Sequence, residues 1–188
     1  LTMELTKSQD LETMRKIGLN VVVIPTPKTF DEICEQTIEI GKLLGVEESA
    51  HEVIRQTKEI VNGVIEKSST QNTKQKVFFQ IGSNPIFSVL QNTFMDDFIL
   101  MNNGENIANG MNKGTMTRES VLVKNPDVII IATMGGFGIE EQEIWKSYKG
   151  LEAAKNNRIF LIESEIACSP TPDNFAKAFT RINQFIKQ

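Results

Sequence analysis

Apolar and polar positions along the chain follow a helical period in two long segments near the front. Apolar residues recur at spacings of three and four from Phe30 to Leu44 and again from Val53 to Ile65. That spacing is typical of a helix with one buried face. The first segment is predicted to be a helix from Thr29 that ends at Gly45, and the second a longer helix of about five turns. The polar stretch KSSTQNTKQK that follows is expected to be a loop.

The residues before these helices follow a shorter pattern. Ser8 is a candidate cap for a helix that Gly18 is expected to end. The β-branched run at 21–24 predicts a strand, which Pro25 terminates. The front of the chain is therefore predicted to be one α/β unit followed by a helix.

Three apolar runs in the second half each lead into a segment rich in Gly, Ser, Asn or Pro, with a helical pattern further on. The runs are KVFFQIG, DVIIIAT and RIFLIE. The helices are expected at Thr93–Met101, Thr117–Lys124, Ile139–Tyr148 and Asp173–Lys187. Strand, loop and helix in succession predict an α/β fold with a parallel sheet covered on both faces.

Ligands of such sheets bind where the strands end, so the loops that follow the three runs are the candidate binding segments. They are Ile81–Ser88, Thr133–Gly138 and Glu163–Thr171. Turns after strands need Gly, Asn and Pro whatever the function, so composition alone does not separate a site from a turn. Phe87, Met134 and Phe137 would either present apolar surface to a large flat ligand or pack in the core, whereas Trp145, inside a helix, is expected in the core.

Composition narrows the class of partner. The net charge is -4 with no local cluster of Lys and Arg, which excludes nucleic acid as a partner. No apolar run approaches the roughly 20 residues that span a bilayer. Cys34 and Cys168 allow two free thiols or one disulfide, and free thiols are expected.

No catalytic or metal-binding set is present in the sequence pattern. The segment MGGFG lacks the spacing of a phosphate-binding or dinucleotide-binding loop. His51, the single histidine, has no ligand partner at metal-site spacing, and we expect it to be solvated. Glu140, Glu141 and Glu143 begin a predicted helix and are expected to face water. Binding loops without a nucleophile and base favour a receptor over an enzyme.

Several segments occur in the order known from one family. They are KVFFQIGSNPIF, NGENIANG, TRESVLVKNPDVIIIA, GLEAAKNNRIFLIE and SPTPDNFAKAF. The chain resembles the binding proteins for vitamin B12, haem and ferric siderophores that serve ABC importers. The resemblance implies two α/β lobes with parallel sheets joined by one long helix, with ligand held between the lobes.

The resemblance also implies a domain division. Residues 1–48 would form a partial N-terminal lobe, 49–72 the interlobe helix and loop, and 73–188 a complete C-terminal lobe. Relative to the family, the N-terminal lobe is expected to be truncated, and the export signal to be missing from this chain. Such a lobe exposes apolar surface, so self-association is expected. Family members act outside the cytoplasm, in the periplasm or as membrane-anchored lipoproteins.

The function implied by the resemblance is capture of a ferric siderophore, haem or cobalamin and its delivery to an ABC permease, with no cofactor besides that iron or cobalt chelate. Glu119, within Thr117 to Leu122, matches the carboxylate that docks on a permease arginine. The implied ligand residues are Gly82, Ser83, Asn84, Phe87, Met134, Gly135, Phe137, Cys168 and Ser169. The alternatives are a nitrogenase-like lobed subunit or enzyme of similar architecture, and a sugar or amino-acid receptor.

Overall fold

The computed structural model describes residues 1–4, 6–68, 73–133 and 137–188. In chain order its elements are β1 (Thr2–Met3), α1 (Ser8–Lys16), β2 (Val23–Ile24), α2 (Phe30–Leu44), α3 (Glu47–Ser68), β3 (Gln75–Ser83), β4 (Ile86–Ser88), α4 (Phe94–Leu100), β5 (Gly104–Asn106), β6 (Thr115–Met116), α5 (Arg118–Lys124), β7 (Val128–Thr133), α6 (Gly138–Ser147), α7 (Glu152–Lys155), β8 (Ile159–Glu163), α8 (Ser164–Ala167) and α9 (Pro172–Lys187). Most predicted helices are confirmed to within a residue or two.

The larger sheet has six strands. Its order is β6-β4-β3-β7-β8, and β5 pairs with the first residues of β3. The strands β3, β5, β7 and β8 run parallel, whereas β4 and β6 are antiparallel to their neighbours. The α/β class is confirmed, and the sheet is mixed because the segment after β3 folds back as a hairpin before the next helix.

Helices cover both faces of this sheet, as predicted. Alternate residues of β7 point to opposite faces, so Val128 and Ile130 join one apolar core while Ile129 and Ile131 join another. The first core includes side chains of α2, α3, α4 and α9. The second surrounds Trp145 of α6, which is fully buried, as the sequence predicted.

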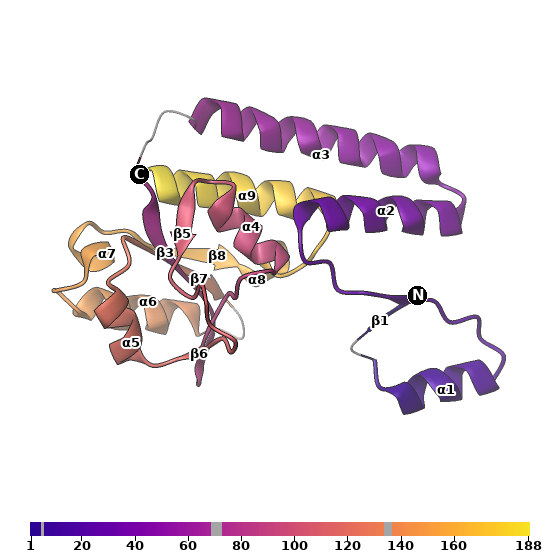
Figure 1. The fold of residues 1–188 in the computed structure, drawn as a ribbon, viewed down its shortest axis with the longest axis horizontal. Helices are drawn as coiled ribbons and strands as arrows, with labels where there is room; N and C mark the ends of the chain where they lie inside the picture. Colours follow the sequence, from indigo (N-terminus) through magenta and orange to yellow (C-terminus); the bar gives the residue numbers. More distant parts are fainter. Residues whose placement is uncertain (5, 69–72, 134–136) are drawn as a thin grey trace.

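The N-terminal unit is small and lies apart from the larger sheet (Figure 1). Its strands β1 and β2 pair in parallel, and β2 covers only two of the four residues predicted for it. Helix α1 has no buried residue. The prediction of Ser8 as its cap is wrong, because Lys7 holds the cap position and no side chain caps the helix; Gly18, at φ 87°, ends it as predicted.

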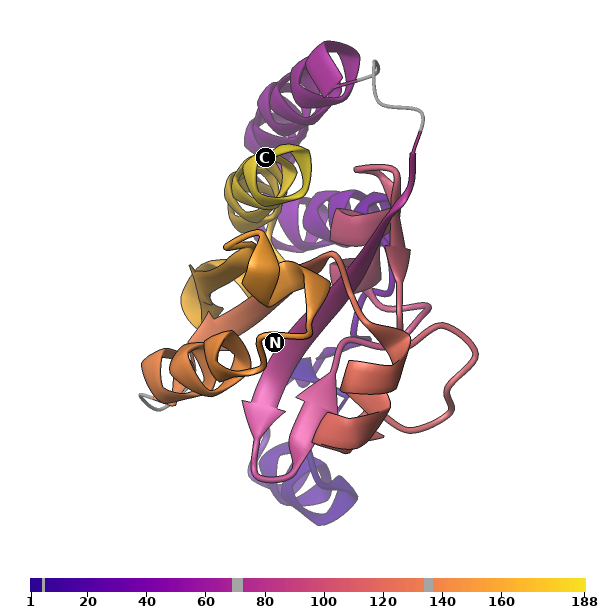
Figure 2. The same cartoon turned by 90° about the vertical axis from the view of Figure 1, so that its left-hand side faces the viewer.

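The helices α2 and α3 pack with α9. The Thr29 side chain accepts a hydrogen bond from the Glu32 backbone, and Gly45 adopts the left-handed conformation after α2, so both predicted helix signals are confirmed. The long helix α3 has 22 residues and is stacked on α9 (Figure 2). The rings of Phe30 and Phe175 stack at 4.3 Å between α2 and α9. The domain division stays a prediction, and both α2 and α3 contribute to the core on this face of the sheet.

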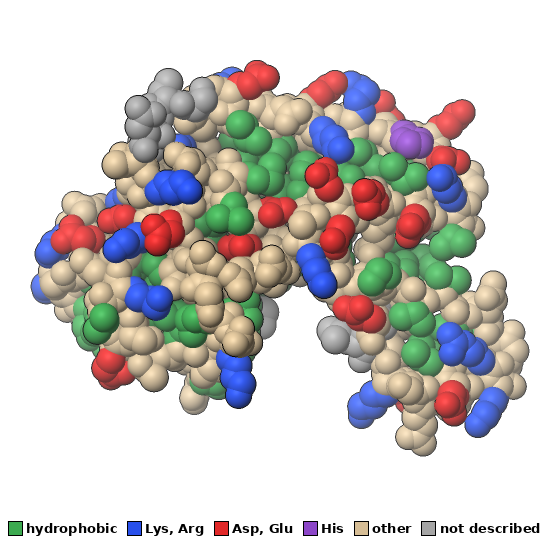
Figure 3. All heavy atoms as spheres, in the orientation of Figure 1, with side chains coloured by type: hydrophobic (Ala, Val, Ile, Leu, Met, Phe, Trp, Pro, Cys, Tyr) green, Lys and Arg blue, Asp and Glu red, His purple; other side chains and the backbone are tan. Residues whose placement is uncertain are grey.

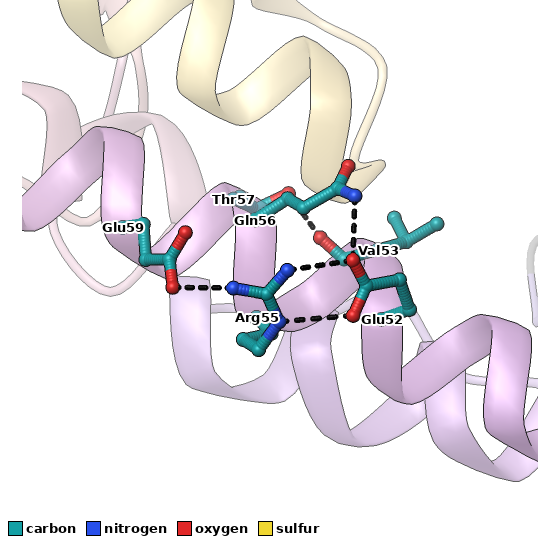
Figure 4. A network of polar contacts seen from close by, with 6 residues as sticks. All are labelled: Glu52, Val53, Arg55, Gln56, Thr57 and Glu59. Carbon is teal, nitrogen blue, oxygen red and sulfur yellow. Dashed lines mark hydrogen bonds and ion pairs between the residues drawn. The ribbon is translucent and has the colours of Figure 1, made fainter.

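The solvent face of α3 carries an ion-pair network (Figure 4). Arg55 donates from Nε and Nη2 to Glu52, three residues before it, and from Nη1 to Glu59, four residues after it. Hydrogen bonds from Arg55 and then Gln56 lower the pKa of Glu52 to about 2. These charges keep the outer side of the helix hydrated, which leaves its apolar side for packing.

The remaining predictions have mixed outcomes. Cys34 and Cys168 are both free, as expected, and His51 is exposed, 3.7 Å from Glu47. The loop expected at 163–171 contains the short helix α8 instead of being irregular throughout. In the described ranges no helix is long and apolar enough to cross a membrane.

Candidate functional site

The sheet brings two of the three predicted binding segments to one edge. Residues of β3 and β7 lie in parallel register, with Gln80 opposite Ile131, and Thr133 of β7 lies opposite Glu163 of β8. Carboxyl ends of parallel strands in register open at the same edge. The segments after β3 and β8 therefore begin at this edge. The third predicted segment includes Met134 and Gly135, which lie outside the described residues.

The segment after β3 is a tight hairpin. Gly82 and Ser83 are half-buried at the end of β3, Asn84 is exposed in the turn, and Phe87 on β4 is 39% exposed. A side chain on Gly82 would come within 3.1 Å of the Phe87 Cβ. The hairpin therefore presents one aromatic ring beside short polar side chains.

The Phe87 ring rests on Gly114, in the segment before β6. A Cβ atom at position 114 would lie 2.4 Å from the ring, so only glycine leaves room for it. The backbone around this contact is held by the Ser88 N–H, which donates to the Gly114 carbonyl at 2.8 Å. The ring is thus supported on one side by backbone and partly open to solvent.

The other predicted ligand residues are less open. Phe137 precedes α6 and packs against the second apolar core, so it acts at least in part as a core residue. Cys168 and Ser169 follow α8 and are both half-buried. Burial, and after it the charge of Glu165, raises the pKa of the Cys168 thiol. Cys168 is therefore protonated at neutral pH, which makes it a poor metal ligand there.

A buried polar cluster behind the hairpin was not predicted. The Gln80 amide donates to the Gly82 carbonyl and to Glu141 Oε2, each at 2.9 Å, and accepts a hydrogen bond of 2.7 Å from Trp145 Nε1. Glu141 Oε1 lies 2.6 Å from Arg118 Nη2. The prediction that Glu141 faces water is wrong: its side chain is 7% exposed because it points inward with Trp145. Glu140 and Glu143 are exposed, as predicted.

Glu119 lies in the first turn of α5 and is exposed. The helix start is fixed by a capping box in which Thr117 and Ser120 each bond the other's backbone. Hydrogen bonds from its own backbone N–H and from the Thr117 hydroxyl hold the pKa of the Glu119 carboxyl below its usual range. One turn further on, Val123 is 85% exposed, so this face of α5 presents a carboxylate and an apolar side chain together.

A concave surface also separates the two units. The space-filling view shows a hollow between the N-terminal unit and the larger body (Figure 3). A cavity of about 350 Å³ is lined by Glu4, by the segment from Pro25 to Lys28 that follows β2, and by α2, which contributes the carboxylates Glu32, Glu35 and Glu39.

Comparison with known families decides the class. A family model described as periplasmic binding protein matches residues 3–166. The chain belongs to this family. A curated relative of this periplasmic binding protein is an uncharacterized ABC transporter substrate-binding lipoprotein, YvrC, of Bacillus subtilis strain 168; it is 22% identical over 166 residues, which are 86% of this chain and 52% of the relative. The chain thus spans about half the length of that relative.

Solved structures agree with this assignment. A possible iron-binding, periplasmic solute-binding protein of Staphylococcus epidermidis is 26% identical with a TM-score of 0.81, over 96% of this chain and 71% of the other. The fold is shared with the haem-binding RhuT of Roseiflexus sp. RS-1 (18% identity, TM-score 0.85, 98% and 73% covered) and the vitamin B12-binding BtuF of Vibrio cholerae (21%, 0.78, 96% and 70%). The family is one of binding proteins rather than enzymes, which confirms the resemblance.

The support of Phe87 in this periplasmic binding protein is testable without a ligand. We expect Gly114→Ala to lower the free energy of unfolding by about 1–3 kcal/mol, because the new methyl group displaces the ring. In a Phe87→Ala background the same change should cost about 0.5 kcal/mol or less, since the obstacle is gone. Urea denaturation of the four variants measures the cycle. Equal losses in both backgrounds would show that the methyl group acts on the backbone and not on the ring.

Proposed function

We propose that this chain is the substrate-binding component of an ABC importer and that it captures a metal chelate: a ferric siderophore, haem or cobalamin. The observation that carries the proposal is the supported, half-open ring of Phe87 at the sheet edge, on a fold shared with haem-binding and vitamin B12-binding proteins. A flat apolar surface next to short polar groups suits a large chelate with apolar faces and a polar rim.

The ligand residues in the proposal are those of the hairpin and of the segment after α8. In the hairpin these residues are Gly82, Ser83, Asn84 and Phe87, and in the segment after α8 they are Cys168 and Ser169. Metal would arrive already chelated, so the protein needs no cofactor of its own. The ligand would be held by shape and a few hydrogen bonds, which is how broad sites for one class of chelates are built.

Delivery to a membrane permease is the second part of the proposal. Glu119 would form the docking ion pair with a basic residue of the permease, and the exposed Val123 beside it would add apolar contact. The curated relative is a lipoprotein. A substrate-binding component of an importer meets its ligand outside the cytoplasm, and this is the location that we propose for this chain. Exposed apolar side chains of the N-terminal unit, such as Ile17 at 72% and Leu19 at 54%, make self-association a further part of the proposal.

Titration with hemin, ferrichrome and cyanocobalamin tests the proposed ligand class. We expect one of the three to raise the unfolding free energy by about 2.7 kcal/mol at a free concentration 100 times its dissociation constant. Metal-free ferrichrome and protoporphyrin serve as matched ligands, and Phe87→Ala as the variant with a weakened site. Thermal unfolding and absorbance spectra provide the readouts. The absence of any response to all three chelates would contradict the proposal.

A further inference from the structure

Helix α5 is short and has a small buried face. It has seven residues, of which Val121 is buried and Leu122 packs, partly buried, against the second apolar core. A helix of this length is not stable on its own in water. The orientation of its exposed side chains therefore depends on the contacts that join it to neighbouring elements.

Arg118, the first residue of α5, makes a second attachment. Its Nη2 lies 2.6 Å from Glu141 Oε1 on α6, and the two side chains are 24% and 7% exposed. The guanidinium carbon lies 4.9 Å from the centre of the Trp145 ring. An ion pair shielded from water, with an aromatic face beneath the cation, is directional and resists screening by salt.

The carboxylate that holds Arg118 is itself fixed. Glu141 Oε2 accepts from the Gln80 amide, whose oxygen is occupied by Trp145 Nε1 and whose nitrogen also binds the Gly82 carbonyl. Gln80 is fully buried, so its rotamer has no solvent alternative. A continuous chain of hydrogen bonds thus runs from the backbone of the hairpin at Gly82 to the first residue of α5.

We propose that Arg118 is the positioning residue for the docking carboxylate of Glu119, and that Glu141 and Gln80 fix it relative to the ligand-binding hairpin. This inference rests on the proposed docking function of Glu119. Val121 and Leu122 hold α5 on the second apolar core, and Arg118 is a separate anchor at its first residue, so that together they set both the place and the rotation of this short helix. Glu119 follows Arg118 directly, so a shift of the first anchor moves the carboxylate away from its partner.

Permease association measures the proposed role. The probe is the permease that this chain serves, purified with its ATPase in lipid nanodiscs, and the variant is Glu141→Gln, which keeps the shape and a hydrogen-bonding oxygen but removes the charge. We expect association to weaken roughly two- to thirtyfold, the range found for residues that transmit coupling without touching the partner. Glu143→Gln, at an exposed position of the same helix, is the matched control and should change nothing.

A double-variant cycle distinguishes positioning from general destabilisation. If Glu141 acts through Glu119, then Glu141→Gln has no further effect on association in a Glu119→Ala background. An equal loss in both backgrounds overturns the proposal, as does full association of the Glu141→Gln single variant. If Glu119→Ala alone leaves association unchanged, the docking function fails and the positioning role falls with it. Fluorescence of Trp145, the single tryptophan of the sequence, verifies that each variant remains folded.

Discussion

Glu141→Ala is expected to lower the free energy of unfolding by about 3–5 kcal/mol, the usual cost of leaving a buried charge without its partner. The change would remove the carboxylate from Arg118 and one of the two acceptors of the Gln80 amide nitrogen. Gln80 is fully buried and the Arg118 side chain is 24% exposed, so water replaces the lost contacts only in part. Urea denaturation at neutral pH, followed by circular dichroism, measures the loss.

Two further variants show whether burial is the cause. Glu143 forms an exposed pair with Lys146, and Glu143→Ala should cost no more than about 1 kcal/mol. A double variant in which Arg118 and Glu141 are both replaced by methionine should recover most of the stability, since neither charge then stays unpaired. A loss below about 1 kcal/mol for Glu141→Ala would contradict an enclosed ion pair.

The second large effect is expected at the proposed docking residue Glu119. Glu119→Ala should weaken permease association and transport by about tenfold or more, because a charge pair across an interface loses one partner. Chelate affinity should be unchanged, since Glu119 lies on α5 and is not among the residues proposed to hold the ligand. Uptake of labelled chelate, with affinity measured in parallel, gives both quantities. Glu105→Ala, an exposed carboxylate on β5, is the matched control. Equal loss of transport and affinity would rule out a docking role.

The lowered pKa of Glu119 leads to a prediction about pH. Hydrogen bonds from its own backbone N–H and from the Thr117 hydroxyl lower the pKa of the Glu119 carboxyl. A carboxyl group with a lowered pKa keeps its charge until the pH falls below that lowered value, so docking should not change between about pH 7 and pH 5. Thr117→Val removes one of these hydrogen bonds, so the pKa of Glu119 should rise. Docking should then be lost at a higher pH than in the unchanged protein. A pH profile that is identical in both proteins would contradict this account of the pKa.

The helices were predictable because their signals are local. Thr29 and Gly45 mark the ends of α2 within the sequence itself, and the apolar period between them identifies the buried face. The same holds for α9, where Thr171 caps the helix and Pro172 occupies its first turn.

The two short strands β4 and β6 were not predictable in this way. Strand β6 has two residues and β4 has three. Strand β4 pairs with β3 in the hairpin and with β6, which lies further along the chain. A run this short carries no period of its own. From the sequence alone the hairpin cannot be told from a loop; in the structure Phe87 lies on β4, opposite Gly82 of β3.

The buried cluster was missed for a related reason. Glutamates in a first helical turn usually face water, and Glu141 was grouped with Glu140 and Glu143 on that basis. Its spacing of four from Trp145, which was expected in the core, was the available signal that it points inward. Its partner Arg118 lies on another element, and nothing in the local pattern connects the two.

The position of α9 has a consequence for biosynthesis. Phe175, Phe179 and Ile182 complete the core that α2, α3 and one face of the sheet share, and Phe175 stacks on Phe30. That core therefore stays open on the ribosome until the chain has been synthesised through α9. The apolar faces of α2 and α3 stay uncovered until then, so this protein is expected to depend on chaperones, or on delayed folding, during translation.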